Sequence, residues 1–132
     1  MRCTVFGSSF LLGVLLSRSI GTAQTQPVEG SVLYKSYCAS CHGTEATGDG
    51  PMAKSLKVPP VDLTRISARN GGTFPLARVS RVISGEEQLP GGHGNRDMPV
   101  WGPVFSHVDA DQDLGRIRID NLARYLGQIQ RR

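Results

Sequence analysis

Three segments of the chain repeat apolar residues at the spacing of an α-helix, and no segment alternates apolar and polar residues as a β-strand does. The apolar stripes predict helices over residues 31–41, 76–83 and 113–130. Gly85 follows the second stripe and is expected to end that helix. Residues 52–56 are expected to form one or two further helical turns. The pattern therefore favours an all-α domain.

The connections between these helices are long and rich in glycine and proline. Residues 43–72 and 85–112 show little periodicity, and loops of this length are uncommon in a compact domain unless they serve a function. Few apolar side chains are left over to build a core. A large apolar cofactor would explain both features, because the loops would wrap around it and its rings would replace missing core side chains.

The first 23 residues have the layout of a secretory signal peptide. Arg2 precedes a mostly apolar run at residues 5–16, and residues 21–23 (Gly-Thr-Ala) offer small side chains before a cleavage site. A retained membrane anchor is the alternative, but the run is shorter than the ~20 residues of a spanning helix. We expect residues 1–23 to be cleaved, residues 24–132 to form one domain, and that domain to be periplasmic or otherwise exported.

Cleavage changes both the charge and the cysteine count. Arg2 and Arg18 leave with the signal peptide, so the formal charge falls from +4 to +2. The remaining chain has no Lys/Arg cluster and few aromatic residues, which argues against nucleic-acid binding. Cys3 also leaves, so that only Cys38 and Cys41 remain, separated by two residues.

Residues 38–42 read Cys-Ala-Ser-Cys-His, the C-x-x-C-H pattern of c-type haem attachment. The two thiols of such a site add to the two vinyl groups of haem, and two intervening residues on a helical turn give the sulfurs the required spacing. His42 follows at once, so its imidazole is placed to bind the iron. The motif predicts one covalent haem c, attached through Cys38 and Cys41 and ligated by His42.

Three other interpretations of the two cysteines are weaker. A thioredoxin-type redox pair needs a strand before the motif, and none is predicted. A structural zinc site needs four ligands, which the remaining cysteines and histidines supply poorly. A plain disulfide would leave both the adjacent histidine and the small core unexplained.

The sixth iron ligand has three candidates downstream of the motif. Met98 lies in a polar loop and is followed at once by Pro99, which makes it a poor residue for filling a core. A thioether is also a good soft ligand for haem iron. We predict Met98 as the ligand, with His93, His107 or an open site as the alternatives.

At these residues the chain resembles the class I mono-haem cytochromes c of bacteria. The resemblance covers most of residues 24–132. It implies a small all-α cytochrome c-like fold, in which three to four helices and long loops wrap around one covalent haem. Gly30 and Tyr34 resemble the N-terminal helix positions that pack on the C-terminal helix, where Leu122 and Tyr125 would be their partners.

Two loops also resemble parts of that family. Residues 48–51 and 59–64 resemble the proximal haem loop, in which a proline carbonyl accepts a hydrogen bond from the proximal imidazole. The resemblance implies this role for Pro59 or Pro60. Residues 98–102 resemble the distal ligand loop, in which Trp101 packs beside the haem or donates its indole N–H to a propionate. The alternative is that Trp101 anchors the core.

The expected function is one-electron transfer by a periplasmic carrier of the respiratory chain, which is not itself an enzyme. We expect a monomer that docks transiently with redox partner proteins and reaches membranes only indirectly, through respiratory complexes. One alternative is a haem subunit, or electron-entry module, of a larger oxidase or dehydrogenase. Another is a haem protein that binds small ligands or reacts with peroxide through an open distal site.

Overall fold

The computed structural model of the chain describes residues 28–87, 98–107 and 112–131. Within these ranges it contains six α-helices, two 3₁₀ turns and no β-strand. In chain order the elements are α1 (Gly30–Tyr37), α2 (Ala39–His42), η1 (Ala53–Ser55), η2 (Leu63–Arg65), α3 (Ile66–Arg69), α4 (Leu76–Ser84), α5 (Trp101–His107) and α6 (Gln112–Gln128). The described part of the chain is all-α, as the sequence predicts.

The predicted signal peptide, residues 1–23, lies outside the described residues, so its cleavage stays a prediction. Among the residues that the structure describes, no helix is both long enough and apolar enough to cross a membrane.

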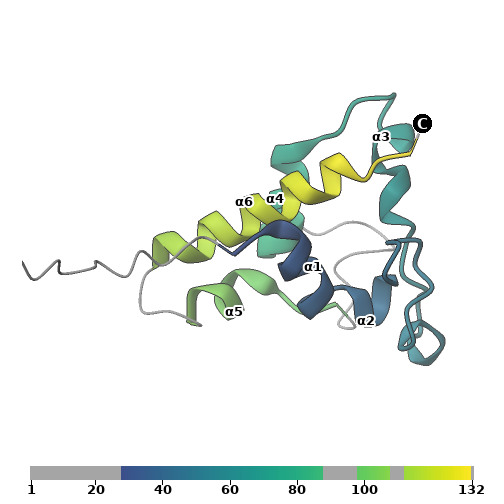
Figure 1. Cartoon of the computed structure of the whole chain (residues 1–132), viewed down its shortest axis with the longest axis horizontal. Coiled ribbons are helices and arrows are strands. Elements are labelled where there is room, and N and C mark those ends of the chain that lie inside the picture. The colour runs from purple at the N-terminus through teal and green to yellow at the C-terminus, as the bar shows by residue number, and fades with distance from the viewer. Residues whose placement is uncertain (1–27, 88–97, 108–111, 132) are drawn as a thin grey trace, which may run out of the picture.

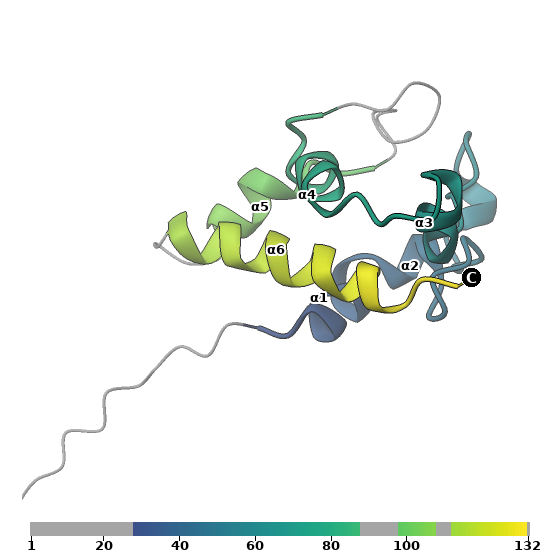
Figure 2. The ribbon, with the colours of Figure 1, turned by 90° about the horizontal axis from the view of Figure 1, so that it is seen from above.

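Helix α6 is the longest element and runs through the middle of the fold (Figure 1). It packs against α1, α4 and α5. In Figure 2, α1 lies on one side of α6, and α4 and α5 lie on the other. The fold is therefore organised around a contact between helices from opposite ends of the chain.

The crossing of α1 and α6 depends on a glycine and a pair of tyrosines. A Cβ at Gly30 would overlap the backbone carbonyl of Asn121, so only glycine allows the two helices to approach this closely. One turn later, the rings of Tyr34 and Tyr125 lie with their centroids 5.5 Å apart. The expected packing of Gly30 and Tyr34 on the last helix is confirmed.

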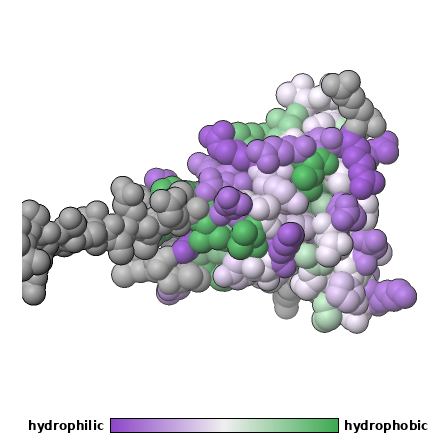
Figure 3. Space-filling model, in the orientation of Figure 1, coloured by the Kyte–Doolittle hydropathy of each residue, from purple (hydrophilic) through white to green (hydrophobic). Residues whose placement is uncertain are grey.

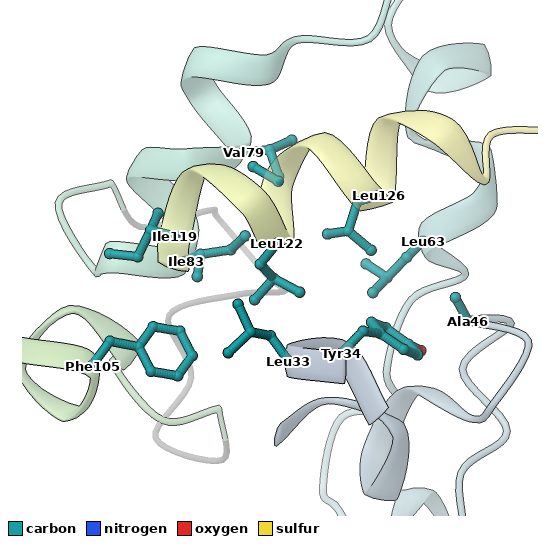
Figure 4. Packing of buried hydrophobic residues seen from close by; sticks show 11 residues of the cluster. Leu33, Tyr34, Ala46, Leu63, Val79, Ile83, Phe105, Ile119, Leu122 and Leu126 are labelled. Atoms are coloured by element: carbon teal, nitrogen blue, oxygen red, sulfur yellow. The ribbon is translucent and has the colours of Figure 1, made fainter. Parts of the chain in front are cut away.

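The core lies between these helices and is small. Figure 4 shows Leu33 and Tyr34 of α1 facing Leu122 and Leu126 of α6. Helix α5 adds Phe105, and the remaining buried apolar residues are Ala46, Leu63, Val79, Ile83, Ile119 and Ala123. Leu122 and Leu126 of this set also line a cavity.

The predicted helices are present, with small changes at their ends. The segment predicted at 31–41 is divided into α1 and α2 at Cys38, whose N–H still bonds to the Tyr34 carbonyl at 2.9 Å. Helix α4 ends as predicted at Gly85, which adopts the left-handed conformation with φ +88°. The short turn expected at 52–56 is η1.

The two long loops contain more helix than the sequence predicts. Helix α5 lies inside the second loop, and η2 with α3 lies inside the first. A proline in the first turn of a helix is tolerated, because its missing N–H has no partner within the helix, and Pro103 occupies the third position of α5. A Cβ at Gly102 would meet the Ser84 carbonyl at 2.6 Å, so glycine at this position lets α5 pack closely against the end of α4. Glycine and proline, which usually disfavour helices, are therefore both compatible with α5.

Exposed apolar side chains are scattered over the surface. On the face shown in Figure 3, hydrophobic residues form separate small patches among polar ones. The large exposed apolar residues of the described part are Val32, Met52, Val61, Val100, Val104 and Ile117. Isolated residues of this kind are normal on soluble domains.

Candidate haem site

The C-x-x-C-H motif occupies α2 and the residue before it. The N–H groups of Cys41 and His42 both bond to the Cys38 carbonyl, at 3.1 and 2.9 Å, so the three side chains are carried by a single helical turn. Cys38 and Cys41 are both partly buried and are not joined by a disulfide. Burial raises the pKa of the Cys38 thiol to about 12, with a further contribution from Cys41. A neutral buried thiol is unlike the low-pKa cysteine of a thioredoxin-type redox pair.

The following loop satisfies the carbonyl groups at the end of α2. Backbone N–H groups at every second position of this loop each bond to one of the last three carbonyls of the helix, which would otherwise lack partners. The pairs are Gly48 to His42 at 2.8 Å, Gly50 to Cys41 at 3.1 Å and Met52 to Ser40 at 2.9 Å. A Cβ at Gly50 would meet the backbone of Ser40 and Cys41 within 2.6 Å. This close approach explains why position 50 is a glycine.

Tyr34 adds a hydrogen bond from α1 to the same helix end. Its hydroxyl donates to the Gly43 carbonyl at 2.6 Å, and the residue is fully buried. Burial also raises the pKa of the Tyr34 phenol. The hydroxyl therefore stays protonated and remains a donor next to the proximal histidine.

His42 is buried, with 7% of its surface exposed. Its Nδ1 lies 3.3 Å from the Val61 carbonyl oxygen. Burial lowers the pKa of the His42 imidazole, an effect partly opposed by this hydrogen bond. The ring is therefore held neutral, with Nδ1 as the donor, and Nε2 is the nitrogen that would ligate the iron of a c-type haem.

The acceptor for His42 is not one of the two prolines that the family resemblance implies. The carbonyl of Val61, one residue beyond Pro60, takes this role, so the expectation of Pro59 or Pro60 is wrong by one position. A Cβ at Gly48 would overlap the Pro60 carbonyl, so glycine at this position lets the two segments pass close to each other. Both prolines still line the cavity in front of the ring.

A cavity of about 550 Å³ opens in front of the His42 ring. This size falls in the range of about 300–1,000 Å³ that is typical of cofactor and ligand sites. Cys38, Cys41, His42 and Met98 all line it, so the structure brings together the four residues predicted from the sequence. Their individual roles, as attachment points for the haem and as ligands of its iron, stay predictions.

The other distal candidates differ in position. His107 does not line the cavity; it is exposed, and its Nδ1 lies 2.6 Å from the Pro103 carbonyl oxygen one turn earlier in α5. His93 lies outside the described residues. Among the candidates that the structure describes, Met98 is therefore the one that faces the cavity.

The walls of the cavity suit a flat apolar ring system. Most of the lining is aliphatic or aromatic, and it is contributed by α4, α6 and the segment between η1 and α3. Trp101 lines the cavity, and its ring also packs on Tyr37 and Phe105, with centroids 5.4 and 5.7 Å away. Its hydrogen bond to a propionate stays a prediction. Arg69 and Arg78 also line the cavity and are exposed; Arg78 pairs with Glu87 at 2.6 Å, and Arg69 donates to the Asp62 carbonyl at 2.7 Å.

An all-α domain that places a C-x-x-C-H turn against an apolar cavity is a c-type cytochrome domain. Residues 25–126 match the family model described as cytochrome C oxidase, cbb3-type, subunit III, and the chain belongs to this family. No curated protein and no solved structure matches the chain. The protein is a mono-haem c-type cytochrome, and its cofactor is a covalently attached haem c that contains the iron.

Sequence reasoning missed the residues that act through their backbone. Val61 contributes a carbonyl, Gly43 accepts from Tyr34, and Ala46 bonds to Leu63 N–H at 2.8 Å through its own carbonyl. Any residue type supplies a carbonyl, so no side-chain pattern marks these positions. Gln130 carries a side-chain signal, but Leu63 and Ser67, two of its partners, are more than 60 residues away in the sequence.

Proposed function

We propose that this cytochrome is a periplasmic one-electron carrier whose haem iron is ligated by His42 and Met98. The observation that supports this proposal is that both side chains line one apolar cavity together with Cys38 and Cys41. The bound haem supplies an iron that accepts and releases one electron. The protein holds the haem, positions the side chains that ligate the iron and keeps the site apolar.

The protein's contribution is to keep the site closed and apolar. His42 is held by Val61, and Met98 is followed by Pro99, which stiffens the loop that carries the sulfur. Two ligands supplied by the protein keep the same coordination in both oxidation states, so little reorganises during transfer. A thioether opposite an imidazole also raises the reduction potential.

The same structure supports transient docking with redox partners. After loss of the signal peptide the formal charge would be only +2, which gives weak overall steering. The exposed apolar residues do not gather into one large patch on the face shown in Figure 3. Both features suit a monomer that releases its donor and acceptor quickly.

The second candidate function is a haem subunit of an oxidase complex. The family description, which names a subunit of a cbb3-type oxidase, favours it. Separating a detergent extract of the native membranes and periplasm by size would distinguish the two. A carrier would elute alone in the soluble fraction, whereas a subunit would elute with larger haem proteins.

The ligand assignment is tested by absorption spectra of the oxidised protein. The native protein should show the weak near-infrared sulfur-to-iron band, and Met98→Ala should abolish it. Met52→Ala is the matched control, since Met52 is half exposed and does not line the cavity. A band that is missing from the native protein, or that survives in Met98→Ala, would show that Met98 is not the ligand.

A further inference from the structure

The side-chain amide of Gln130 joins the end of α6 to the segment that carries Val61. Its Oε1 accepts from the Ser67 N–H at 2.8 Å, and its Nε2 donates to the Leu63 carbonyl at 2.8 Å. Leu63 and Ser67 are four residues apart, so these two backbone groups would bond to each other in a regular α-helix. The glutamine amide thus bridges the backbone at the junction of η2 and α3.

The same amide is fixed on its own side of the contact. Nε2 also donates to the Leu126 carbonyl of α6 at 2.7 Å. The neighbouring Arg131 adds a backbone bond from its N–H to the Thr64 carbonyl at 2.8 Å. Four hydrogen bonds therefore tie residues 130 and 131 to α6 and to the η2–α3 junction.

This junction begins two residues after the acceptor of the proximal imidazole. Leu63 is held from both directions, because its N–H bonds to the Ala46 carbonyl at 2.8 Å and its carbonyl bonds to Gln130. Asp62 completes the turn by accepting from the Thr64 N–H at 2.8 Å. The backbone between Val61 and Ser67 therefore has little freedom to move while Gln130 is in place.

We propose that Gln130 is a positioning residue that keeps the Val61 carbonyl aimed at Nδ1 of His42 and thereby helps to set the reduction potential of the iron. Gln130 itself does not line the cavity, so it acts through the backbone of the η2–α3 junction. The inference rests on the proposed electron-transfer function, since it concerns the potential at the same iron.

The expected direction follows from the chemistry of the imidazole. A hydrogen bond from Nδ1–H to a carbonyl increases the basicity of the ring, and a more basic ligand stabilises the ferric state. Loosening the Val61 carbonyl weakens that bond. Loss of the Gln130 amide should therefore raise the reduction potential.

The test uses the haem-loaded protein and two variants of matched length. Gln130→Met keeps the size of the side chain and removes its amide, while Gln130→Glu keeps an acceptor for Ser67 and removes the donor to Leu63. Gln128→Ala is the control, since Gln128 is exposed on the last turn of α6, two residues before Gln130. The readouts are the reduction potential and the proton resonance and exchange rate of His42 Nδ1–H in the reduced protein.

We expect Gln130→Met to lower the oxidised-to-reduced ratio at a fixed potential by about threefold. That is less than the roughly 10–100-fold loss of metal affinity or activity that follows removal of an outer-sphere partner, because here the carbonyl is loosened rather than lost. The Nδ1–H resonance should shift and its exchange should quicken. Gln130→Glu should change the Nδ1–H resonance and exchange in the same way, while its added negative charge opposes the rise in potential. Gln128→Ala should match the native protein.

The inference is overturned if both Gln130 variants lose thermal stability but keep the native potential and the native His42 proton. That result would make Gln130 a structural tie alone. Failure of the proposed function looks different, because it would be seen in the native protein as a missing sulfur-to-iron band or as no electron exchange with a redox partner.

Discussion

The hydroxyl of Tyr34 joins helix α1 to the end of the helix that carries His42. The residue is fully buried, and its hydroxyl donates to the Gly43 carbonyl at 2.6 Å. Its ring also packs on Tyr125, so one side chain contributes to the helix crossing and to the haem site. Local order at the proximal ligand is thereby coupled to the packing of α1 on α6.

Tyr34→Phe should destabilise the protein by about 1–3 kcal/mol, because the ring packing is retained while the buried Gly43 carbonyl loses this donor. Denaturant unfolding of the haem-loaded protein measures the change. The control is Tyr125→Phe, which removes the hydroxyl of the other ring in the pair and should stay within about 0.5 kcal/mol of the native protein. Equal losses in the two variants would show that the Tyr34 hydroxyl contributes nothing particular.

Single residues differ in how well the sequence predicts their roles. Cys38, Cys41 and His42 were predicted because thioether attachment and iron ligation require those side chains at that spacing, and all three line the cavity. The acceptor of the His42 proton was predicted one residue too early. A carbonyl is common to every residue, so only the backbone path after Gly48 selects Val61.

Among the helices, the contact of α1 with α6 is the one most sensitive to side-chain size. Gly30 lies directly against the Asn121 carbonyl and the Tyr125 side chain. Any Cβ at this position must push the two helices apart. Helix α6 of this pair also carries Leu122 and Leu126, which belong to the core and line the cavity.

Gly30→Ala should therefore cost about 1–3 kcal/mol of stability, the usual range for forcing an extra carbon into a packed contact. The better helix propensity of alanine offsets only part of this loss. Thermal or denaturant unfolding measures it, and Ser36→Ala provides an exposed control on the same helix. Should Gly30→Ala prove as stable as Ser36→Ala, the close approach of α1 and α6 would not be needed.

The strongly periodic helices were predictable, and the short ones were not. Helix α4 has its apolar residues on one face and a glycine at its end, so the pattern defined both the element and its last turn. Helix α5 has only seven residues and begins Trp-Gly-Pro, which reads as a loop. Its stability comes from tertiary contacts, with Phe105 fully buried and Trp101 stacked against it, and local sequence does not encode these contacts.

At the scale of the whole molecule, the core and the cavity share their residues. Val79, Ile83, Leu122 and Leu126 are core residues, and they also line the cavity. Leu63 does the same from the proximal side. Long loops and few apolar residues predicted a core completed by a cofactor, and this shared lining is the arrangement expected of one. Haem burial should therefore contribute to folding as well as to electron transfer.

Preventing haem attachment should for this reason destabilise the whole domain. Cys38→Ala combined with Cys41→Ala leaves no thiol for the vinyl groups, and the apolar walls around about 550 Å³ then lose their central contact. We expect lower helix content by circular dichroism and unfolding at lower denaturant concentration than in the haem-loaded protein. Cys3→Ala is the control, because Cys3 lies in the predicted signal peptide and should leave attachment unchanged. A double variant with native helix content and native stability would show that the small core is sufficient without the cofactor, and that the loops fold independently of what they enclose.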